Sequence, residues 1–463
     1  MSPLLPDRPP FTLRARLVSP AADGGSIDEP DGLLEVGADG RIGWLGSASR
    51  TDAPAGWRAA AVDVRPLVLL PGMIDLHAHL PQLPNAGLGA GLDLLTWLDR
   101  YIFPLERRFD TADAAARLAP AAFRAFAAAG TTTLLAYGAV FKASTDGAFR
   151  AAEAHGIRAI LGQVMMDRLT YDEQIEPSTI LEQSLRESEE LIAAWHGAAD
   201  GRLGYAVTPR FGVSCSADML RESAALAART GTWWQSHVAE DPGEVAAVAR
   251  LFPEARDYVD VYDRAGGLGS RTVLAHAVHL SDRELDRLVA TGTRVAHCPS
   301  SNLFLASGVM PLSRYLQVGL VVGLGSDVAG GPDASIFSVM RVGAYAQTAL
   351  RLVAGDAILP LGPLDWLRLG TLAGARALGL EDRTGSLEVG KDADLIAVDP
   401  RLTTPLRGLP YDAEALEATD LMSRLIYRSH PDMVRAAWVR GRSLDGPPGV
   451  DRVGSRRIAR ATA

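Results

Sequence analysis

Two histidines that lie two positions apart, His77 and His79, close an apolar run in the segment PGMIDLHAHLPQ. In a β-strand, side chains two residues apart point to the same side, so both imidazoles would face one point in space. Imidazole nitrogens are common ligands of zinc and related metals, and a pair on one face can share an ion. A lone HxH pair is weak evidence, because spaced histidines also occur by chance on protein surfaces.

Three further candidate ligands end later apolar runs of the chain. His237 closes TWWQSH, His276 closes TVLAH and Asp327 closes LVVGLGSD. Each residue alone has an ordinary structural interpretation, as a hydrogen-bonded core histidine or as an aspartate that caps a helix. Three nitrogen ligands and one carboxylate together suit zinc at a catalytic site with room for water, and they would suit iron or manganese less specifically.

The elements that must position these residues are repeated βα units. From about residue 67 to 380, short β-branched or apolar runs alternate with Ala-, Leu- and Arg-rich stretches at helical spacing. The strand candidates are residues 67–79, 131–138, 157–166, 203–211, 232–237, 272–276, 294–299 and 320–327. This pattern predicts an α/β fold with a (β/α)8 TIM-type barrel, in which active sites lie where the strands end. The candidate ligands would therefore meet at one mouth.

The two ends of the chain have a different texture. Residues 11–66 contain short apolar runs broken by DG and GG turn signals, and Asp39 with Gly40 suits a tight hairpin. Hairpin-like runs return near the C-terminus in SLEVGKDADLIAVDP and VRAAWVRGRSL. We therefore expect a small discontinuous β-sandwich domain made of 1–66 and 383–463, with the barrel formed by 67–382.

Composition excludes several classes of partner. The formal net charge of -9 and pI near 5.6 argue against a protein that binds nucleic acid, which needs a basic face. We expect no membrane span and no signal peptide, because the sequence has neither a long uncharged apolar run nor a basic start followed by one. Cys215 and Cys298 are the only cysteines, which favours a reducing compartment and predicts a cytoplasmic protein.

The sequence resembles the amidohydrolase superfamily and, within it, the guanine deaminases. The resemblance is carried by PGMIDLHAHLPQ, LLTWLDRYIFPLERRF, MMDR, VTPRFGVSCS, QSHVAEDPGEV, TVLAHAVHLS, AHCPSSNLFLASG and GLGSDVAGG, which span nearly the whole predicted barrel. The HxH pair, the histidines at strand ends and the aspartate are shared across the superfamily. The HxPQ sequence, the WL…Y.FP.E.RF block and TPRF are narrower signals, and the resemblance to guanine deaminases depends on them.

The resemblance implies a set of metal ligands, namely His77, His79, His237 and Asp327. It also implies that His276 lies beside the bound water and that Glu240 is the proton shuttle. Physical chemistry agrees with these roles, since a zinc ion brings the pKa of its water toward 7 and nearby bases can take the proton. Without the histidine three positions before it, Glu240 would be interpreted as a solvated acid in the run EDPGE.

One metal per chain is expected. Some relatives bind two metals through a carboxylated lysine at the end of the fourth strand, but this strand ends in TPRF, and neither Lys142 nor Lys391 is placed to serve. The resemblance therefore implies a mononuclear site with Zn2+, for which Fe2+ is the alternative ion.

Substrate binding is assigned by the resemblance to Gln82, Arg210 and Phe211, together with His237 and Glu240. We expect Arg210 to bind the carbonyl edge of a purine, Gln82 to contact adjacent ring atoms and Phe211 to pack against the ring face. The structural alternatives are a salt bridge for Arg210 and a core position for Phe211.

The segment after the HxH pair departs from the family pattern. Leu83 stands where an aromatic residue is expected, and the Gly- and Pro-rich sequence LPQLPNAGLGAGLD predicts a mobile lid. Trp97, Tyr101 and Phe103 are expected to pack in a helix over the mouth of the barrel.

The expected reaction is zinc-dependent hydrolytic deamination of guanine to xanthine and ammonia, in purine catabolism and by a homodimer, as the resemblance implies. One alternative is another mononuclear amidohydrolase that deaminates or dechlorinates a different ring amidine, such as 8-oxoguanine, a triazine, a pterin or an adenosine-type nucleoside. A different class of alternative is a non-catalytic amidohydrolase-like scaffold protein, which the complete set of ligand residues disfavours.

Overall fold

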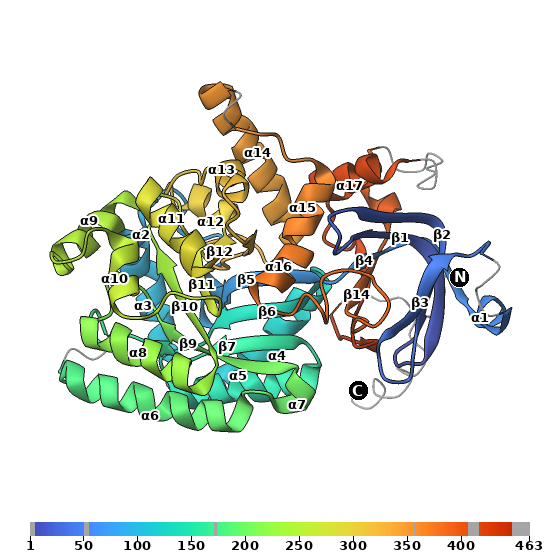
Figure 1. Ribbon diagram of the computed structural model, residues 1–463. Coiled ribbons are helices and arrows are strands. Elements are labelled where there is room, and N and C mark those ends of the chain that lie inside the picture. Colours follow the sequence, from blue (N-terminus) through green and yellow to red (C-terminus); the bar gives the residue numbers. More distant parts are fainter. Residues whose placement is uncertain (1–4, 51–54, 171–173, 356–357, 406–415, 447–463) are drawn as a thin grey trace, which may run out of the picture.

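A barrel covered by helices lies beside a smaller, strongly curved sheet built from both ends of the chain (Figure 1). The computed structural model describes residues 5–50, 55–170, 174–355, 358–405 and 416–446. Residues 1–4, 51–54, 406–415 and 447–463 of the predicted terminal domain lie outside the described residues.

The barrel strands run parallel, and each lies next to the strand that follows it in the barrel. They are β5 (Met73–His79), β6 (Thr131–Tyr137), β7 (Arg158–Gly162), β9 (Leu203–Pro209), β10 (Trp233–Val238), β11 (Thr272–His276), β12 (Arg294–His297) and β13 (Val322–Leu324). A short strand, β8 (Val164–Met165), pairs with β9. Each of the predicted barrel strands is therefore confirmed, and so is the TIM-type architecture.

The barrel closes between its last and first strands through backbone hydrogen bonds. The amide of Asp327 donates to the carbonyl of His77 over 2.7 Å, and the amide of His79 donates to the carbonyl of Val328 over 3.0 Å. The ring of strands is thus closed beside the candidate ligands, and the backbones of His77 and Asp327 are joined by a hydrogen bond.

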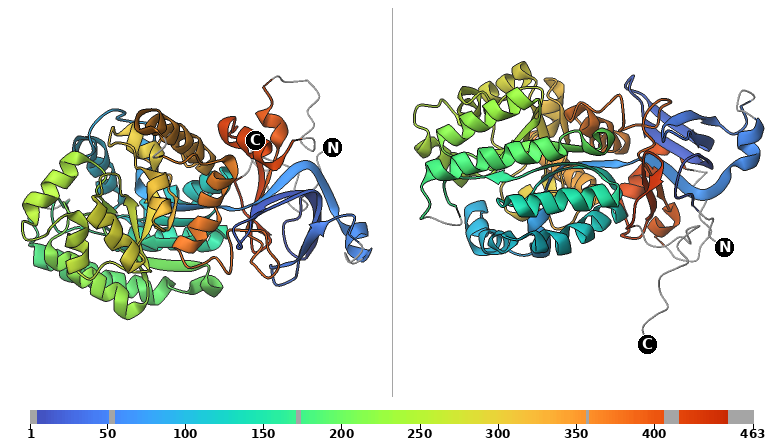
Figure 2. Two further views of the ribbon diagram at one scale, coloured as in Figure 1. Left: turned by 45° about the horizontal axis from the view of Figure 1, so that its top comes forward. Right: turned by 90° about the horizontal axis from the view of Figure 1, so that it is seen from below.

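Amphipathic helices cover the outside of the barrel (Figures 1 and 2). The outer helices are α4 (Ala112–Ala128), α5 (Lys142–His155), α6 (Pro177–Trp195), α8 (Ala217–Thr230), α9 (Pro242–Leu251), α10 (Tyr258–Arg264), α11 (Asp282–Thr291), α13 (Leu312–Gln317) and α14 (Ile336–Ala354). Local sequence sets several of their ends. Helix α11, for example, begins with a capping box of Ser281 and Glu284 and ends at Gly292, which has a left-handed backbone.

Shorter elements connect the strands or lie at the barrel ends. They are η1 (Leu80–Asn85), α2 (Leu94–Trp97), η2 (Leu98–Ile102), α3 (Phe103–Glu106), η3 (Arg107–Phe109), α7 (Ala198–Gly201), α12 (Pro299–Phe304), α15 (Pro363–Leu369), α16 (Leu372–Ala377), η5 (Pro400–Thr403) and α17 (Ala418–Tyr427). The segment from η1 to η3 follows the HxH strand directly. It therefore runs from the end of that strand at the mouth of the barrel.

The second sheet is mainly antiparallel and contains strands from both ends of the chain. In spatial order its strands are β16 (Arg442–Ser443), β15 (Val434–Val439), β14 (Leu395–Val398), β4 (Val62–Pro71), β1 (Phe11–Pro20), β2 (Ser26–Val36) and β3 (Ile42–Ser47), and the short helix α1 (Ala55–Ala60) precedes β4. The predicted hairpin at Asp39 and Gly40 is confirmed, since it joins β2 to β3. The exact domain boundaries stay a prediction.

The first strand candidate, 67–79, divides into two strands that belong to different sheets. Strand β4 pairs with β1 and β14 of the small sheet, whereas β5 begins the barrel directly after Gly72. A Cβ atom at Gly72 would lie 2.0 Å from Thr132 Oγ1, so only glycine fits where the chain passes from one sheet to the other.

An apolar layer fills the lower part of the barrel, beneath the candidate ligands. It includes Leu76, Leu135, Ala206, Val273 and Ala296, all of which are buried. This packing leaves the polar side chains at the strand ends as the upper boundary of the interior. None of the helices in the described part of the chain combines the length and the apolar character needed to span a bilayer.

Candidate active site

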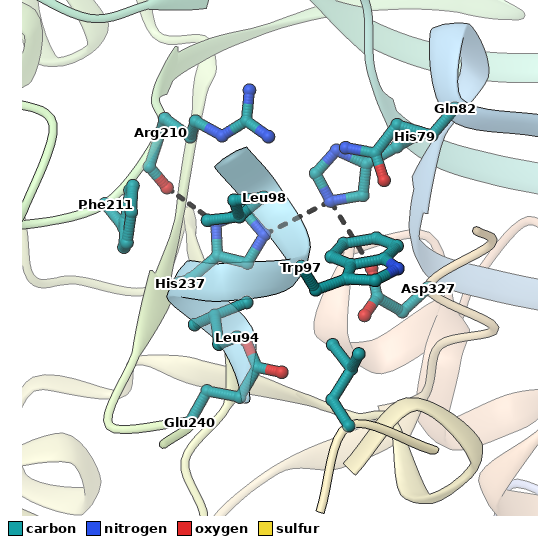
Figure 3. Close-up of a pocket in the computed structure, with 11 residues that line it drawn as sticks. His79, Gln82, Leu94, Trp97, Leu98, Arg210, Phe211, His237, Glu240 and Asp327 are labelled. Carbon is teal, nitrogen blue, oxygen red and sulfur yellow. Dashed lines mark hydrogen bonds and ion pairs between the residues drawn. The ribbon is translucent and has the colours of Figure 1, made fainter. Parts of the chain in front are cut away.

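Four potential ligand atoms meet at the mouth of the barrel. His79 Nε2 lies 3.2 Å from His77 Nε2 and 3.2 Å from His237 Nε2. Asp327 Oδ1 lies 3.1 Å from His77 Nε2 and 3.3 Å from His79 Nε2. Figure 3 shows the imidazoles of His79 and His237 and the carboxylate of Asp327 pointing toward one another. The geometry therefore brings together residues from β5, from β10 and from the loop after β13.

These separations suit a tetrahedral metal site. Bonds of about 2.0 Å to a tetrahedral ion place neighbouring ligand atoms about 3.3 Å apart. The four separations given above, between 3.1 and 3.3 Å, match that spacing. His77, His237, His276 and Asp327 also each place a ligand atom within 4.8 Å of the others. The donor set is thus suited to a divalent metal, with His276 at its edge.

Hydrogen bonds and burial prepare the histidines as neutral ligands. His237 Nδ1 donates to the carbonyl of Arg210 over 2.6 Å, which leaves the lone pair of Nε2 directed into the site. Burial lowers the pKa of His77 to about 4 and holds the pKa of His237 well below its ordinary value. Both imidazoles are therefore unprotonated at neutral pH, as metal ligands must be.

A buried aspartate beneath the ligands holds the last strand against the first. Asp75 accepts hydrogen bonds from the amide and the hydroxyl of Ser326, over 2.9 and 2.5 Å, and from the amide of His77 over 3.1 Å. Burial raises the pKa of Asp75 to about 7, although the bonds from Ser326 oppose that shift. Since Ser326 directly precedes Asp327, this contact fixes the height of the Asp327 carboxylate relative to His77.

His276 lies beside the donor set with its tautomer fixed. Its Nδ1 donates to Asn302 Oδ1 over 2.9 Å, so Nε2 carries a lone pair toward the site. That Nε2 lies 3.8 Å from Asp327 Oδ2. His276 and Asp327 both have a left-handed backbone, with φ values of 73° and 49°. Such conformations are costly for residues other than glycine and gather at sites where side chains must be aimed.

Glu240 faces the same space from the turn between β10 and α9. Its backbone amide donates to Glu244 Oε2 over 2.8 Å, and Asp241 caps α9, so the turn is well anchored. Ser307 Oγ donates to Glu240 Oε1 over 3.3 Å. Burial, followed by the charge of Asp327, raises the pKa of Glu240 well above its ordinary range. A carboxyl group in this setting can hold and deliver a proton.

A pocket of about 350 Å³, counted with its open mouth, lies over the donor set. It is lined by His79, Gln82, Leu94, Trp97, Leu98, Arg210, Phe211, His237, Glu240, Leu305 and Asp327. In Figure 3 the helical segment that carries Leu94, Trp97 and Leu98 crosses the site. The prediction that aromatic residues of this segment pack over the mouth is confirmed for Trp97, which is buried. Its indole Nε1 donates to the carbonyl of Leu88.

The residues expected to bind substrate all line this pocket. Gln82, Arg210 and Phe211 are each at most 2% exposed. The ring of Phe211 lies edge-on to the ring of His237, with centroids 6.2 Å apart. Arg210 also forms a buried ion pair with Glu106, so the salt bridge weighed as its structural alternative exists and coexists with a pocket position.

Sequence reasoning assigned no role to Asp75, Ser326, Asn302 or Glu106. Asp75 precedes His77 by two residues in the same strand, and this spacing could have predicted that its side chain lies on the same face as those of His77 and His79. Asn302 and Glu106 lie in segments that the sequence analysis singled out, HCPSSN and FPLE, but no local pattern indicates their partners. The two lysines contact other groups, Lys142 with Glu190 and Lys391 with Ser386, and neither joins the donor set.

Residues 68–444 of the chain match the Amidohydrolase family. The chain is 41% identical to a probable guanine deaminase of Deinococcus radiodurans, over 89% of this chain and 92% of that protein. It is 35% identical to the guanine deaminase of Escherichia coli K12, over 87% of this chain and 90% of that protein.

A solved structure shares the same arrangement of elements. The guanine deaminase of C. acetobutylicum, with guanine bound in its active site, superimposes with a TM-score of 0.85 at 28% sequence identity. The match covers 94% of this chain and 99% of that one. The likeness thus extends over the barrel and the small sheet together.

Proposed function

Because this chain belongs to the amidohydrolase family and, within it, to the guanine deaminases, we propose that it hydrolyses guanine and water to xanthine and ammonia. The observation that carries this proposal is the position of Glu240, which lies 3.3 Å from His276 and lines the same pocket as His79, His237 and Asp327, together with Gln82 and Arg210. A proton-carrying acid, a metal-binding donor set and groups that recognise an amide edge are the parts that such a hydrolysis needs.

We assign the metal to His77, His79, His237 and Asp327, with one Zn2+ per chain and Fe2+ as the alternative. The tetrahedral spacing of the donor atoms and the lowered pKa values of His77 and His237 support this set. The bound ion supplies Lewis acidity, which lowers the pKa of a water molecule and makes a nucleophile available near neutral pH.

The protein side chains around the donor set handle the protons. Asp327 and His276 would accept the proton of the attacking water, and the 3.8 Å separation of His276 Nε2 and Asp327 Oδ2 supports this shared role. Glu240 protonates the ring nitrogen next to the amino-bearing carbon as the water oxygen bonds to that carbon. The hydroxyl proton of the resulting adduct then passes through Glu240 to the amino group, which leaves as ammonia while the carbonyl of xanthine forms, and the proton taken up by Asp327 and His276 restores Glu240.

The substrate is held by its polar edge and its face. Arg210 donates to the ring carbonyl, Gln82 contacts the adjacent ring nitrogen, and Phe211 packs against the face of the ring. His237 and Glu240 complete the wall around the amino-bearing carbon. The small pocket and the closing segment with Trp97 support a free base rather than a substrate with a large appendage.

The metabolic role, oligomeric state and cellular compartment are proposed from the same family membership. We propose that the protein acts in purine catabolism, as a homodimer, in the cytoplasm, a reducing compartment that suits its two free cysteines. The absence of a strongly basic composition agrees with a small substrate rather than a nucleic acid.

The test is a hydrolysis assay on zinc-loaded protein with a panel of ring amidines. We expect guanine to be consumed with stoichiometric release of ammonia and formation of xanthine. Asp327→Asn, which removes the charge of a proposed ligand and a proposed proton acceptor, should abolish the release of ammonia and the formation of xanthine. Turnover of 8-oxoguanine, a triazine, a pterin or adenosine without turnover of guanine would refute the substrate. A pure, metal-loaded protein that hydrolyses none of them would refute the enzymatic function.

A further inference from the structure

Glu106 lies at the end of α3 and is buried against both polar groups of the pocket wall. Its Oε1 accepts from Gln82 Nε2 over 2.8 Å, and its Oε2 accepts from Arg210 Nη1 over 2.5 Å. All three side chains are at most 3% exposed. One carboxylate therefore contacts a residue from the segment after β5 and a residue from the end of β9, which are far apart in the sequence.

The charge of Glu106 decides which way the Gln82 amide faces. A guanidinium does not lose its proton in proteins, and a buried guanidinium requires an anionic partner. Glu106 is accordingly a carboxylate, which can only accept hydrogen bonds. The NH2 group of Gln82 must then face Glu106, and its carbonyl oxygen must face away from that carboxylate. The orientation of the amide follows from this pairing and not from the free rotation of the side chain.

The same carboxylate also holds the guanidinium of Arg210 in place. The guanidinium carbon lies 5.2 Å from the ring centroid of Phe103, on the same short helix as Glu106. Figure 3 shows that the guanidinium of Arg210 and the amide of Gln82 lie on the same side of the pocket. The wall thus presents hydrogen-bond donors from Arg210 beside an acceptor oxygen from Gln82.

We propose that Glu106 is a positioning residue that sets this donor–acceptor order and thereby selects purines with a carbonyl next to a ring N–H. This inference rests on the proposed function and deepens it. The carbonyl oxygen and adjacent N–H of guanine match an Arg210 donor and the Gln82 oxygen. A purine that has a hydrogen or an amino group in place of this carbonyl also has no proton on the adjacent ring nitrogen. Its unprotonated ring nitrogen would face the buried Gln82 oxygen, and two acceptors would then oppose each other.

The experiment compares two substrates in the zinc-loaded wild type and in Glu106→Gln. Guanine carries the matching edge, whereas 2-aminopurine keeps the reacting amino group and lacks both the carbonyl and the N–H. A glutamine at position 106 can donate hydrogen bonds as well as accept them, so the side-chain amide of Gln82 is free to rotate by 180°. We expect kcat/KM for guanine to fall roughly 10- to 100-fold. The value for 2-aminopurine should stay within about threefold of the wild type.

If 2-aminopurine is bound and not turned over, its inhibition constant against guanine replaces kcat/KM in the comparison. Asp99→Asn is the matched control, because it makes the same change of charge at an exposed position of the same segment. Its ratio of guanine to 2-aminopurine should equal that of the wild type. Zinc content and the thermal unfolding midpoint are measured for each variant.

Different outcomes separate this inference from the proposed function. If the wild type hydrolyses guanine, two results for Glu106→Gln would overturn the proposed role of Glu106. One is an equal fall in kcat/KM for both purines, and the other is no fall in kcat/KM for guanine. A wild type that neither binds nor hydrolyses guanine would overturn the proposed function and this inference with it. Should Glu106→Gln fail to fold, Glu106→Asp keeps the charge and shortens the reach, and we expect it to lower the same ratio.

Discussion

Glu240 and His276 face each other across the mouth of the barrel, with 3.3 Å between Glu240 Oε2 and His276 Nε2. Both side chains are buried, and they lie at the ends of neighbouring barrel strands: His276 is the last residue of β11, and Glu240 follows β10 by two residues. The hydrogen bond from His276 Nδ1 to Asn302 directs the Nε2 lone pair toward the carboxyl group. A proton can therefore be shared between these two residues without a change in the position of either.

Glu240→Gln should separate proton transfer from metal binding. The substitution keeps the size of the side chain and removes its ability to carry a proton, so we expect kcat to fall roughly 10²- to 10⁴-fold. Zinc content measured by elemental analysis should remain near that of the wild type, because Glu240 is not a proposed ligand. Glu153→Gln, at an exposed position of α5, is the control. Unchanged turnover in Glu240→Gln would remove this residue from the mechanism.

Asn302→Leu tests whether activity depends on the tautomer of His276. Leucine has nearly the same shape and cannot accept the proton of His276 Nδ1, so the imidazole loses its fixed orientation. We expect kcat to fall about 10- to 100-fold with little change in zinc content. Asn302→Asp, which keeps an acceptor oxygen, should retain more activity than the leucine variant. Equal activities of the two variants would contradict this explanation.

Asp327→Asn should weaken metal binding and remove its stabilising effect. A ligand that binds only the folded chain stabilises it by about 2.7 kcal/mol at a concentration one hundred times its dissociation constant. Added zinc should thus raise the unfolding midpoint of the metal-stripped wild type and hardly change that of the variant. Asp333→Asn, an exposed substitution in the same loop, should respond like the wild type. An equal zinc response in Asp327→Asn would contradict the ligand assignment.

His297 should make the folded state sensitive to acid. Burial lowers the pKa of His297 to about 3, and among the described residues neither of its ring nitrogens has a hydrogen-bond partner. The unfolded chain binds a proton at this histidine below about pH 6.5, whereas the folded chain binds it only near pH 3. The free energy of unfolding therefore falls as the pH drops through that window, by up to about 1.4 kcal/mol per pH unit.

His297→Leu removes this titration and should flatten the loss of stability toward acid. Urea unfolding of the metal-stripped chain at pH 7 and pH 4.5 measures the difference between variant and wild type. The same substitution at the half-buried His430 serves as the control. Parallel pH dependence of the His297 variant and the wild type would show that another group governs the acid sensitivity.

The sequence by itself determined the barrel strands and the residues that end them. Strand parity predicts that His77 and His79 share a face, because the side-chain period of a strand is two residues. The C-terminal ends of parallel barrel strands meet at one mouth, so the convergence of His237, His276 and Asp327 follows from order along the chain. These are local regularities, and a single sequence displays them directly.

Only the tertiary structure decided which polar groups hold these residues in place. Glu106 contacts Gln82 and Arg210, which lie 24 and 104 positions away, and Asp75 contacts Ser326 across 251 positions. The passage from β4 to β5 at Gly72 was likewise hidden in one continuous apolar run. Such pairings depend on how the helices and loops pack in three dimensions, and no periodicity along the chain records that packing.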